Sequence, residues 1–539
     1  MTEQIAVQVL DGKLADEAAT IAGQLAGDRV ASKLAAQDST LWGPDAESEA
    51  AIRLSWTGLA ETSRPLVEQI TALRTELAAE GVGRVVLAGM GGSSLAPEVI
   101  AGTAGVPLVV LDTTDAGQVA DALAGDLART VVVVSSKSGS TVETDSHRRI
   151  FLDAFTKAGV DGASRIVVVT DPGSPLATLG TDSGYRKVFL ADPHVGGRYS
   201  ALTAFGLVPA GLAGADIGAL LDDAAAAAPL LAQDSDTNPA LVLAAALATR
   251  HSTGAEKVVL ADSGSGIAGF PDWAEQLIAE STGKNGTGLL PVAVEGVSAP
   301  GFADAGSDAT PVAIGADEAP ATIGTSGSLG GQFLLWENAV AVAGRLLGIN
   351  PFDQPDVEAA KAAARTLLDA PTGGTEAPPA FTEGPIEVHP SNGWLPAGTD
   401  SVAAALNALV AAAPEFGYVA VQAYLDRLDD ASAALLRAEV ARRSGLQTTF
   451  GWGPRFLHST GQYHKGGHQN GVFLQVTGAV AEDIAVPDRP YTLGVLQHAQ
   501  ALGDGSVLAD HGRPVLRLHL TDRVAGLAEL FKAVAEVSR

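Results

Sequence analysis

The chain has 539 residues, of which 46% are hydrophobic and 18% charged, a composition typical of a globular protein with more than one hydrophobic core. The formal net charge of −28 argues against nucleic acid or an anionic membrane as a partner, because both attract a basic surface. The chain has no cysteine, which excludes disulfides, thiolate metal sites and cysteine nucleophiles. The N-terminal residues lack the pattern of a signal peptide and no apolar run is long enough to span a membrane, so we expect a cytoplasmic protein.

The N-terminal half predicts helices followed by a parallel sheet. Residues 16–79 are helical in pattern, with a break at Gly43-Pro44. Short apolar runs then alternate with helical segments, which is typical of a doubly wound α/β sheet. The expected strands are residues 85–88, 108–111, 131–134, 166–170 and 188–190.

The rest of the chain predicts two further α/β regions. An Ala- and Leu-rich helical stretch covers residues 201–250, and a second α/β unit runs from residue 258 to about residue 370. Residues 371–400 are rich in Pro and Gly and predict a linker or a meandering surface segment. Strands at 418–423, 472–476 and 515–520 and a helix at 522–537 follow. We therefore divide the chain into residues 1–80 (helical), 81–235 (first α/β domain with the phosphate turns), 236–370 (second α/β domain) and 371–539 (linker and C-terminal α/β extension).

A hydroxyl-rich turn at residues 135–144 follows the strand predicted at 131–134 and precedes a predicted helix at 147–155. Backbone N–H groups at a helix N-terminus bind anions, and Ser and Thr hydroxyls add uncharged donors. Lys137 adds a positive charge. A phosphorylated small molecule is therefore the leading ligand hypothesis.

A glycine-rich turn, Gly89-Met90-Gly91-Gly92-Ser93-Ser94, follows the strand at 85–88. Alone, it is either a strand-to-helix turn that needs positive φ or a cradle for an anion or sugar. It lacks the spacing of the dinucleotide fingerprint and of the Walker loop. Because it and the hydroxyl-rich turn both lie at carboxyl ends of strands, the pair favours a phosphate site.

Three charged residues in other blocks have both a structural and a functional interpretation. Arg198 follows two glycines and either forms a surface ion pair or meets a ligand. Glu280 lies near a helix C-terminus, where a carboxylate opposes the helix dipole. Lys361 follows the segment Asn350-Pro351-Phe352-Asp353-Gln354 and alone would be a solvated helix lysine.

A histidine cluster occupies residues 458–468 and contains His458, His464 and His468. A zinc site is one interpretation, but no carboxylate or cysteine lies at ligand spacing. A catalytic or substrate-contacting histidine is the other.

Taken together, these blocks resemble the phosphoglucose isomerase family of the sugar-isomerase fold superfamily, over roughly residues 50–365. The resemblance implies two sugar-isomerase-type doubly wound parallel sheets (αβα sandwiches), to which this chain adds the C-terminal α/β extension. It implies isomerisation of glucose 6-phosphate and fructose 6-phosphate, a step of glycolysis and gluconeogenesis, with no cofactor and no metal, in a homodimer. The implied substrate-binding residues are Gly91, Gly92, Ser93, Ser136, Lys137, Ser138, Thr141, Thr144 and Gln354. The implied catalytic residues are Glu280 as the base, Arg198 and Lys361.

The chain departs from the family in one catalytic position. The common form has a ring-opening histidine between the base glutamate and the Asn-Pro-Phe-Asp-Gln block, and this chain has no histidine between Glu280 and Asn350. Our hypothesis is that His464 or His458 replaces it, from the long region beyond Lys361. The amino-acid sequences of residues 90–98 and 456–462 resemble the isomerase half of transaldolase–isomerase fusions.

Two alternative functions stay open at this stage. An isomerase of this kind could also accept mannose 6-phosphate, because tolerance at C2 depends on the shape of the pocket. A non-catalytic sugar-phosphate regulator would keep the two turns but would not need Glu280, Arg198 or Lys361.

Overall fold

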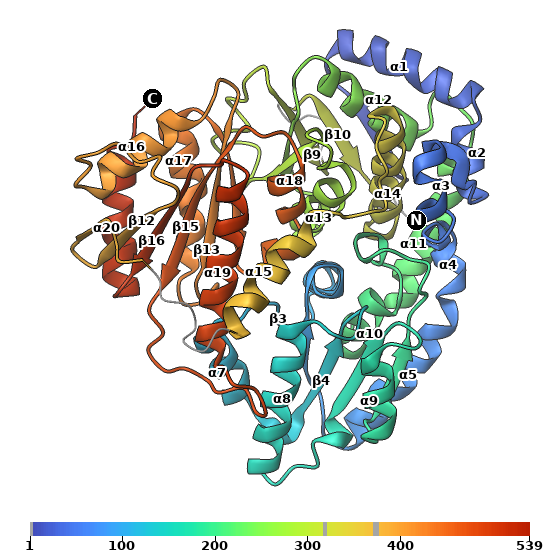
Figure 1. The fold of residues 1–539 in the computed structure, drawn as a ribbon. Coiled ribbons are helices and arrows are strands. Elements are labelled where there is room, and N and C mark those ends of the chain that lie inside the picture. The colour runs from blue at the N-terminus through green and yellow to red at the C-terminus, as the bar shows by residue number, and fades with distance from the viewer. Residues whose placement is uncertain (1–3, 316–320, 370–376, 539) are drawn as a thin grey trace.

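A computed structural model describes residues 4–315, 321–369 and 377–538, with only the backbone of residues 357–361 and 369 within helix α15. The described residues form three sheets that surround a common centre, where α13, α15 and α18 meet (Figure 1). None of the helices in these ranges is long and apolar enough to cross a membrane.

The first sheet is fully parallel, in the order β3-β2-β4-β5-β6, and it confirms the five predicted strands. Alternate valines of β4 enter the hydrophobic clusters on opposite faces of the sheet, so helices cover both faces. The strands are β2 (Arg84–Gly89), β3 (Val109–Leu111), β4 (Thr130–Ser135), β5 (Ile166–Thr170) and β6 (Lys187–Leu190). The helices are α5 (Arg64–Ala79), α6 (Leu95–Thr103), α7 (Ala116–Ala124), α8 (Val142–Lys157), α9 (Pro175–Asp182) and α10 (Ala204–Ala213).

The second sheet has the order β1-β10-β9-β7-β8 and takes its edge strand from the N-terminus. Strand β1 pairs antiparallel with β10, and the remaining pairs are parallel. The strands are β1 (Ala6–Val9), β7 (Lys257–Asp262), β8 (Leu290–Ala293), β9 (Ala309–Ile314) and β10 (Ile323–Ser326). The helices are α1 (Gly12–Gly27), α2 (Val30–Ala35), α3 (Pro44–Ala50), α4 (Leu59–Thr62), α11 (Ile217–Leu231), α12 (Pro239–Ser252), α13 (Phe270–Thr282) and α14 (Leu329–Leu346).

Strand β1 precedes the predicted helices of residues 16–79 and was not predicted from the sequence. Its four residues are too few to reveal a strand by alternation, and they are stabilised by pairing with a distant segment. The break at Gly43-Pro44 is confirmed, because Gly43 has a φ of 85° and Pro44 begins α3. The domain boundaries at residues 80, 235 and 370 stay predictions.

The third sheet has the order β11-β12-β16-β15-β13-β14. Its last four strands are parallel, while β11 and β12 form an antiparallel hairpin that pairs with β16. The strands are β11 (Phe381–Glu383), β12 (Ile386–Pro390), β13 (Tyr418–Tyr424), β14 (Gln447–Trp452), β15 (Gly471–Gly478) and β16 (Val515–Leu520). The helices are α15 (Val357–Asp369), α16 (Val402–Ala412), α17 (Leu436–Ser444), α18 (Gly461–Gly466), α19 (Leu493–Asp510) and α20 (Arg523–Ala535).

Two features of this sheet differ from the sequence predictions. Part of the predicted linker forms β11 and β12. Gly384 and Pro385 lie between these two strands, and Pro390 is the last residue of β12, so the glycine and the prolines fall at strand ends. Strand β14 was not predicted, since its sequence Gln-Thr-Thr-Phe-Gly-Trp contains no apolar run, although it pairs along its whole length with β13.

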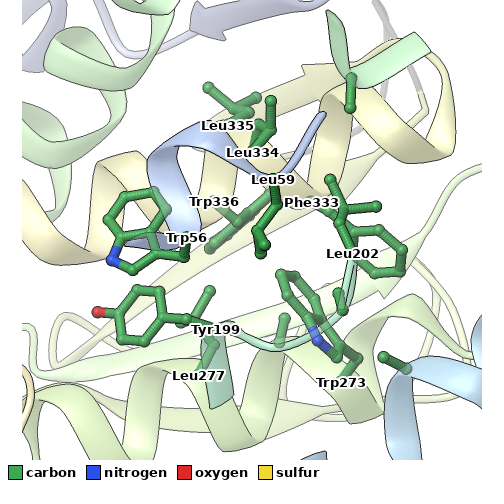
Figure 2. Close-up of a cluster of buried hydrophobic side chains, with 14 of the residues drawn as sticks. Trp56, Leu59, Tyr199, Leu202, Trp273, Leu277, Phe333, Leu334, Leu335 and Trp336 are labelled. Atoms are coloured by element: carbon green, nitrogen blue, oxygen red, sulfur yellow. The ribbon is translucent and has the colours of Figure 1, made fainter. Parts of the chain in front are cut away.

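An aromatic cluster joins the N-terminal segment to the second sheet. Figure 2 shows Trp56 lying against Tyr199, with their ring centroids 5.0 Å apart and stacked. In the same cluster the rings of Trp273 on α13 and Phe333 on α14 meet edge to face, with centroids 4.6 Å apart. Because Tyr199 follows Arg198 directly, the position of that arginine is set by the rigid core.

A polar cavity of about 450 Å³ lies where α6, α13 and β14 converge. Arg455 lies 2.6 Å from Glu98 and 3.2 Å from Asp112, so those two carboxylates are paired. Glu275 also lines the cavity, and burial raises its pKa to about 8, with the nearby Asp272 adding to the effect. Glu275 is therefore protonated in the folded protein at neutral pH.

Replacing Glu275 with Gln should stabilise the protein increasingly as the pH rises. Between about pH 4.5 and pH 8 the carboxyl is ionised in the unfolded chain but protonated in the folded one, so the wild type loses stability as pH rises through that window. Gln has the same shape but does not have to take up a proton on folding. We therefore expect the free energy of unfolding of the variant to exceed that of the wild type by a few kcal/mol at about pH 8. Urea unfolding of both proteins at a series of pH values measures it.

The exposed Glu415→Gln variant is the matched control and should change stability little at any pH. A free energy difference between wild type and Glu275→Gln that stays constant from acid to alkaline pH would contradict the prediction.

Candidate active site

The two predicted turns lie side by side at the switch point of the first sheet. The chain passes from β2 to β3 on one side and from β4 to β5 on the other, and β2 and β4 are neighbours. Ligands of open α/β sheets bind outside the carboxyl ends of such strands. The 3-10 turn Gly91–Ser93 follows β2, and the hydroxyl-rich turn follows β4. The structure therefore brings both turns to the same edge of the first sheet.

The hydroxyl-rich turn is ordered by its own side chains. The Ser136 Oγ lies 2.8 Å from the Thr141 Oγ1 and accepts a hydrogen bond from the Gly139 N–H at 3.1 Å. Thr141 is the N-cap of α8, so the N-terminus of that helix opens at the turn. The Thr144 Oγ1 is buried and has no hydrogen-bond partner among the described residues. The turn thus offers hydroxyl and helix N-terminal groups to an anion.

Two predicted ligands of this turn have partners within the protein. The Lys137 Nζ lies 2.5 Å from the Asp171 Oδ2 and also donates to the Pro193 carbonyl. The Ser138 Oγ lies 3.1 Å from the Ser140 Oγ at an exposed position. The Lys137 charge is therefore held beside the turn by an ion pair with Asp171.

The glycines of the first turn allow other parts of the site to approach the backbone. Gly91 has a φ of 56°, and a Cβ added there would lie 2.7 Å from the His458 carbonyl oxygen. A Cβ on Gly92 would lie 2.0 Å from the carbonyl oxygen of Gly197. Only glycine fits at these contacts, which join the turn to the segments that carry Arg198 and His458. Ser93 is buried at the end of the same turn.

Arg198 is buried and its guanidinium joins three segments of the chain. Its Nε donates to the Ser281 Oγ at 3.0 Å, and one terminal nitrogen donates to the Glu280 Oε2 at 3.2 Å and the Gln354 Oε1 at 3.3 Å. The other terminal nitrogen donates to the backbone carbonyls of Pro351 and Asp353, at 2.7 and 2.9 Å. The structure thereby brings together Arg198, Glu280 and Gln354 as predicted from the sequence.

Glu280 lies on the last turn of α13 and its carboxylate is 6% exposed. One oxygen pairs with Arg198, and the other accepts from the Gln276 Nε2 at 3.2 Å. The same Gln276 amide donates to the His458 carbonyl at 2.9 Å. A sheltered carboxylate between an arginine and an amide is oriented for proton transfer at a ligand in the crevice.

Lys284 is a site residue to which the sequence analysis assigned no role. Its Nζ donates to the carbonyls of Asn350 and Asp353 and lies 2.6 Å from the Asp353 Oδ1. Burial lowers the Lys284 pKa to about 8, and the nearby Arg198 adds to the effect. Lys284 therefore positions the block that contains Gln354. Lys361 lies in α15, and its side chain is outside the described residues.

The three clustered histidines point to three different partners. The His458 Nε2 lies 3.1 Å from the Glu143 Oε1, and the same Glu143 oxygen accepts from the Gln500 Nε2 at 2.7 Å. The His464 Nδ1 lies 3.0 Å from the Tyr418 hydroxyl, and the His468 Nδ1 lies 2.9 Å from the Glu256 Oε2. Within the part of the chain that the structure describes, these imidazoles do not converge into a metal-sized group.

His458 and His464 differ in their contacts with the other candidate site residues. Glu143, the partner of His458, lies in the first turn of α8 beside the hydroxyl-rich turn, and the His458 carbonyl is tied to Gln276. The His464 ring instead stacks on Tyr418 and meets Phe473 edge to face, and burial holds its pKa well below its usual range. Of the two, His458 contacts both parts of the site.

Known proteins resemble the part of the chain that carries most of this candidate site. The sequence model of the family "Phosphoglucose isomerase" matches residues 58–303. The chain is 35% identical over 218 residues to a protein named probable glucose-6-phosphate isomerase from Natronomonas pharaonis, covering 40% of this chain and 50% of that protein. It is 36% identical over 224 residues to glucose-6-phosphate isomerase from a Synechococcus strain, covering 38% and 41%. The chain thus spans about half the length of the relatives it matches.

Solved structures show the same fold. A glucose-6-phosphate isomerase from Chlamydia trachomatis superposes with a TM-score of 0.56 at 19% identity, over 69% of this chain and 90% of that one. A hypothetical protein from Thermus thermophilus superposes with a TM-score of 0.58 at 24% identity, over 68% of this chain and 100% of that one. The predicted pair of sugar-isomerase-type sheets with a C-terminal α/β extension is therefore confirmed. The segment 58–303, which holds both turns, Arg198 and Glu280, belongs to the phosphoglucose isomerase family.

Proposed function

We propose that the protein interconverts D-glucose 6-phosphate and D-fructose 6-phosphate through an open-chain sugar and a cis-enediolate. The observation that carries the proposal is the buried pair of Glu280 and Arg198, 3.2 Å apart, linked through Gln276 and His458 to the hydroxyl-rich turn. A base, a fixed positive charge and a phosphate anchor are what this isomerisation needs.

The phosphate would be anchored by the two turns of the first sheet. Gly91, Gly92 and Ser93 supply one wall, and Ser136, Lys137, Ser138, Thr141 and Thr144 supply the other. The unpartnered hydroxyl of Thr144 and the N-terminus of α8 support this assignment. Binding energy from the phosphate, remote from the reacting carbons, holds C1 and C2 against the catalytic groups.

Glu280 would be the base that moves a proton between C2 and C1. It is sheltered from water, and its two oxygens are fixed by Arg198 and Gln276. Arg198 would stabilise the negative oxygen of the enediolate without giving up a proton. The contacts of its terminal nitrogen to Glu280 and Gln354, at 3.2 and 3.3 Å, are its longest, so a substrate oxygen would replace those rather than the backbone contacts.

His458 and Lys361 would move protons at the ring oxygen and O1 when the sugar ring opens. The carboxylate of Glu143 orients the His458 imidazole. His464, the other predicted candidate, lies against Tyr418 and Phe473, so the contacts favour His458.

The sequence analysis left two alternative functions open, a regulatory sugar-phosphate protein and a dual isomerase. A purely regulatory sugar-phosphate protein would not need the buried pair of Arg198 and Glu280. A dual isomerase that also accepts mannose 6-phosphate would use the same groups. From the amino-acid sequences of residues 90–98 and 456–462, we infer that the chain is related to the isomerase half of transaldolase–isomerase fusions. A homodimer and a cytoplasmic location stay predictions.

Glu280→Gln should abolish most of the isomerase turnover while substrate-like ligands still bind. The amide keeps the shape and the contact with Arg198 but cannot take up a proton, so we expect kcat to fall by about 10²–10⁴ or more. Steady-state kinetics and binding of 6-phosphogluconate measure the two properties. Glu275→Gln on the same helix is the matched control and should keep its turnover; wild-type turnover in Glu280→Gln would remove Glu280 from the mechanism.

The assignment of the ring-opening histidine predicts a difference between two variants. His458→Asn should slow turnover of cyclic glucose 6-phosphate by about 10²–10⁴, because general acid–base catalysis of ring opening is lost. The same variant should turn over an aldose phosphate that cannot cyclise at a rate much closer to that of the wild type. His464→Asn should leave the ratio of the two rates unchanged, since its ring lies in the core. A selective loss on cyclic substrate in His464→Asn, with His458→Asn unaffected, would reverse the assignment.

A further inference from the structure

The third sheet has a switch point of its own, like the one that carries the candidate active site. From β13 the chain passes to β14 on one side, and from β15 it passes to β16 on the other, while β13 and β15 are neighbours. The first sheet has the same relation between β2 and β4, where the two turns lie. By the same rule, the carboxyl ends of β13 and β15 are where a ligand of the third sheet would bind.

A cavity of about 260 Å³ lies at this position. A cavity of this size suits a small metabolite rather than a drug-sized molecule. Its walls come from the ends of β13, β15 and β16 and from one side of α19. They include Tyr424, Thr477, Gly478, Gln497, His498 and His519.

The cavity offers hydrogen-bond donors and, among the described residues, has no Asp or Glu in its lining. Gln497 is 4% exposed, and its Nε2, which can only donate, has no acceptor within the described parts of the chain. An unsatisfied buried donor costs stability, so an acceptor from a ligand would be favoured there. The His519 Nδ1 lies 3.0 Å from the Thr477 Oγ1, which fixes the orientation of that ring.

The charged groups around His519 come from two strands and the helix. Arg517 lies on β16, Glu387 and His389 on β12 and His498 on α19. Burial lowers the pKa of His519 to about 4 and also lowers that of His498. Arg523 donates to the carbonyl of Ala479, a residue that lines the cavity, and its charge is paired with Asp115 and Asp430. The cavity therefore presents neutral rings and an amide, and the charged side chains nearest to His519 are Arg517 and Glu387.

We propose that this cavity is a second binding site, for a small metabolite that carries a carboxylate or phosphate group. The oxyanion accepts hydrogen bonds from Gln497 and from the rings of His498 and His519. A cation is disfavoured because no carboxylate lines the cavity. The site is separate from the residues around Glu280, and it does not depend on the reaction assigned to them.

The test uses the full-length protein with carbon-13-labelled histidine rings and two probes, inorganic phosphate and malonate. The chain has 10 histidines, and the signals of His498 and His519 are assigned by their loss in the His498→Asn and His519→Asn variants. We expect one probe to shift both signals in a saturable way, with a dissociation constant of about 1 mM or tighter. The signal of His511, exposed at the end of α19, should not move. The probe that saturates tells whether the ligand carries phosphate or carboxylate.

Gln497→Leu should weaken the binding of that probe at least about tenfold, because a hydrogen bond to an anion is lost. Gln24→Leu, an exposed substitution on α1, is the matched control and should leave it unchanged. The proposal is overturned if neither probe shifts the two signals at up to about 30 mM, well above a millimolar dissociation constant. A shift at His458 alone reports binding in the candidate active site and also counts against it, as does unchanged affinity in Gln497→Leu.

Discussion

The buried guanidinium of Arg198 is the contact on which the candidate site depends. A guanidinium has five N–H donors, and here the acceptors are Ser281, Glu280, Gln354 and the carbonyls of Pro351 and Asp353. Removing a charged group of this kind from water is costly unless its donors are satisfied. The acceptors come from α13 and from the block after α14, so satisfying the arginine fixes both segments against the first sheet. The proposed base, Glu280, is oriented by the same group that would stabilise the enediolate.

The C-terminal region completes the site rather than standing apart from it. The Gln462 Nε2 donates to the Gly283 carbonyl at 2.9 Å and to the Asp356 Oδ2 at 2.7 Å, which ties α18 to the end of α13 and to the start of α15. A Cβ on Gly283 would lie 2.6 Å from the Tyr463 Cα, so the contact is backbone to backbone. This packing brings His458 to Gln276 and Glu143 in a single chain. His458 is therefore our candidate for the ring-opening histidine that is missing between Glu280 and Asn350.

Much of the fold and part of the site follow from local sequence patterns. The strands of the first sheet are apolar runs, and the glycine and hydroxyl content of the turns after β2 and β4 predicts a phosphate site there. Strands β1 and β14 could not be found this way, because each is stabilised by pairing with a distant strand. The pairing of Lys137 with Asp171 and of His458 with Glu143 depends on tertiary contacts that no spacing reveals. The sequence shows Lys284 only as a lysine near a helix end, and its contact with the block that contains Gln354 depends on the ion pair with Asp353.

The central claim is that a buried carboxylate moves a proton between C2 and C1. Its most direct test is the fate of deuterium at C2 of glucose 6-phosphate during conversion by the wild-type protein in ordinary water. The account predicts a primary isotope effect and a product in which part of the label has reached C1 and part has been lost to solvent, because the proton resides on Glu280 between the two steps. Complete retention of the label at C1, as in a direct hydride shift, would contradict it.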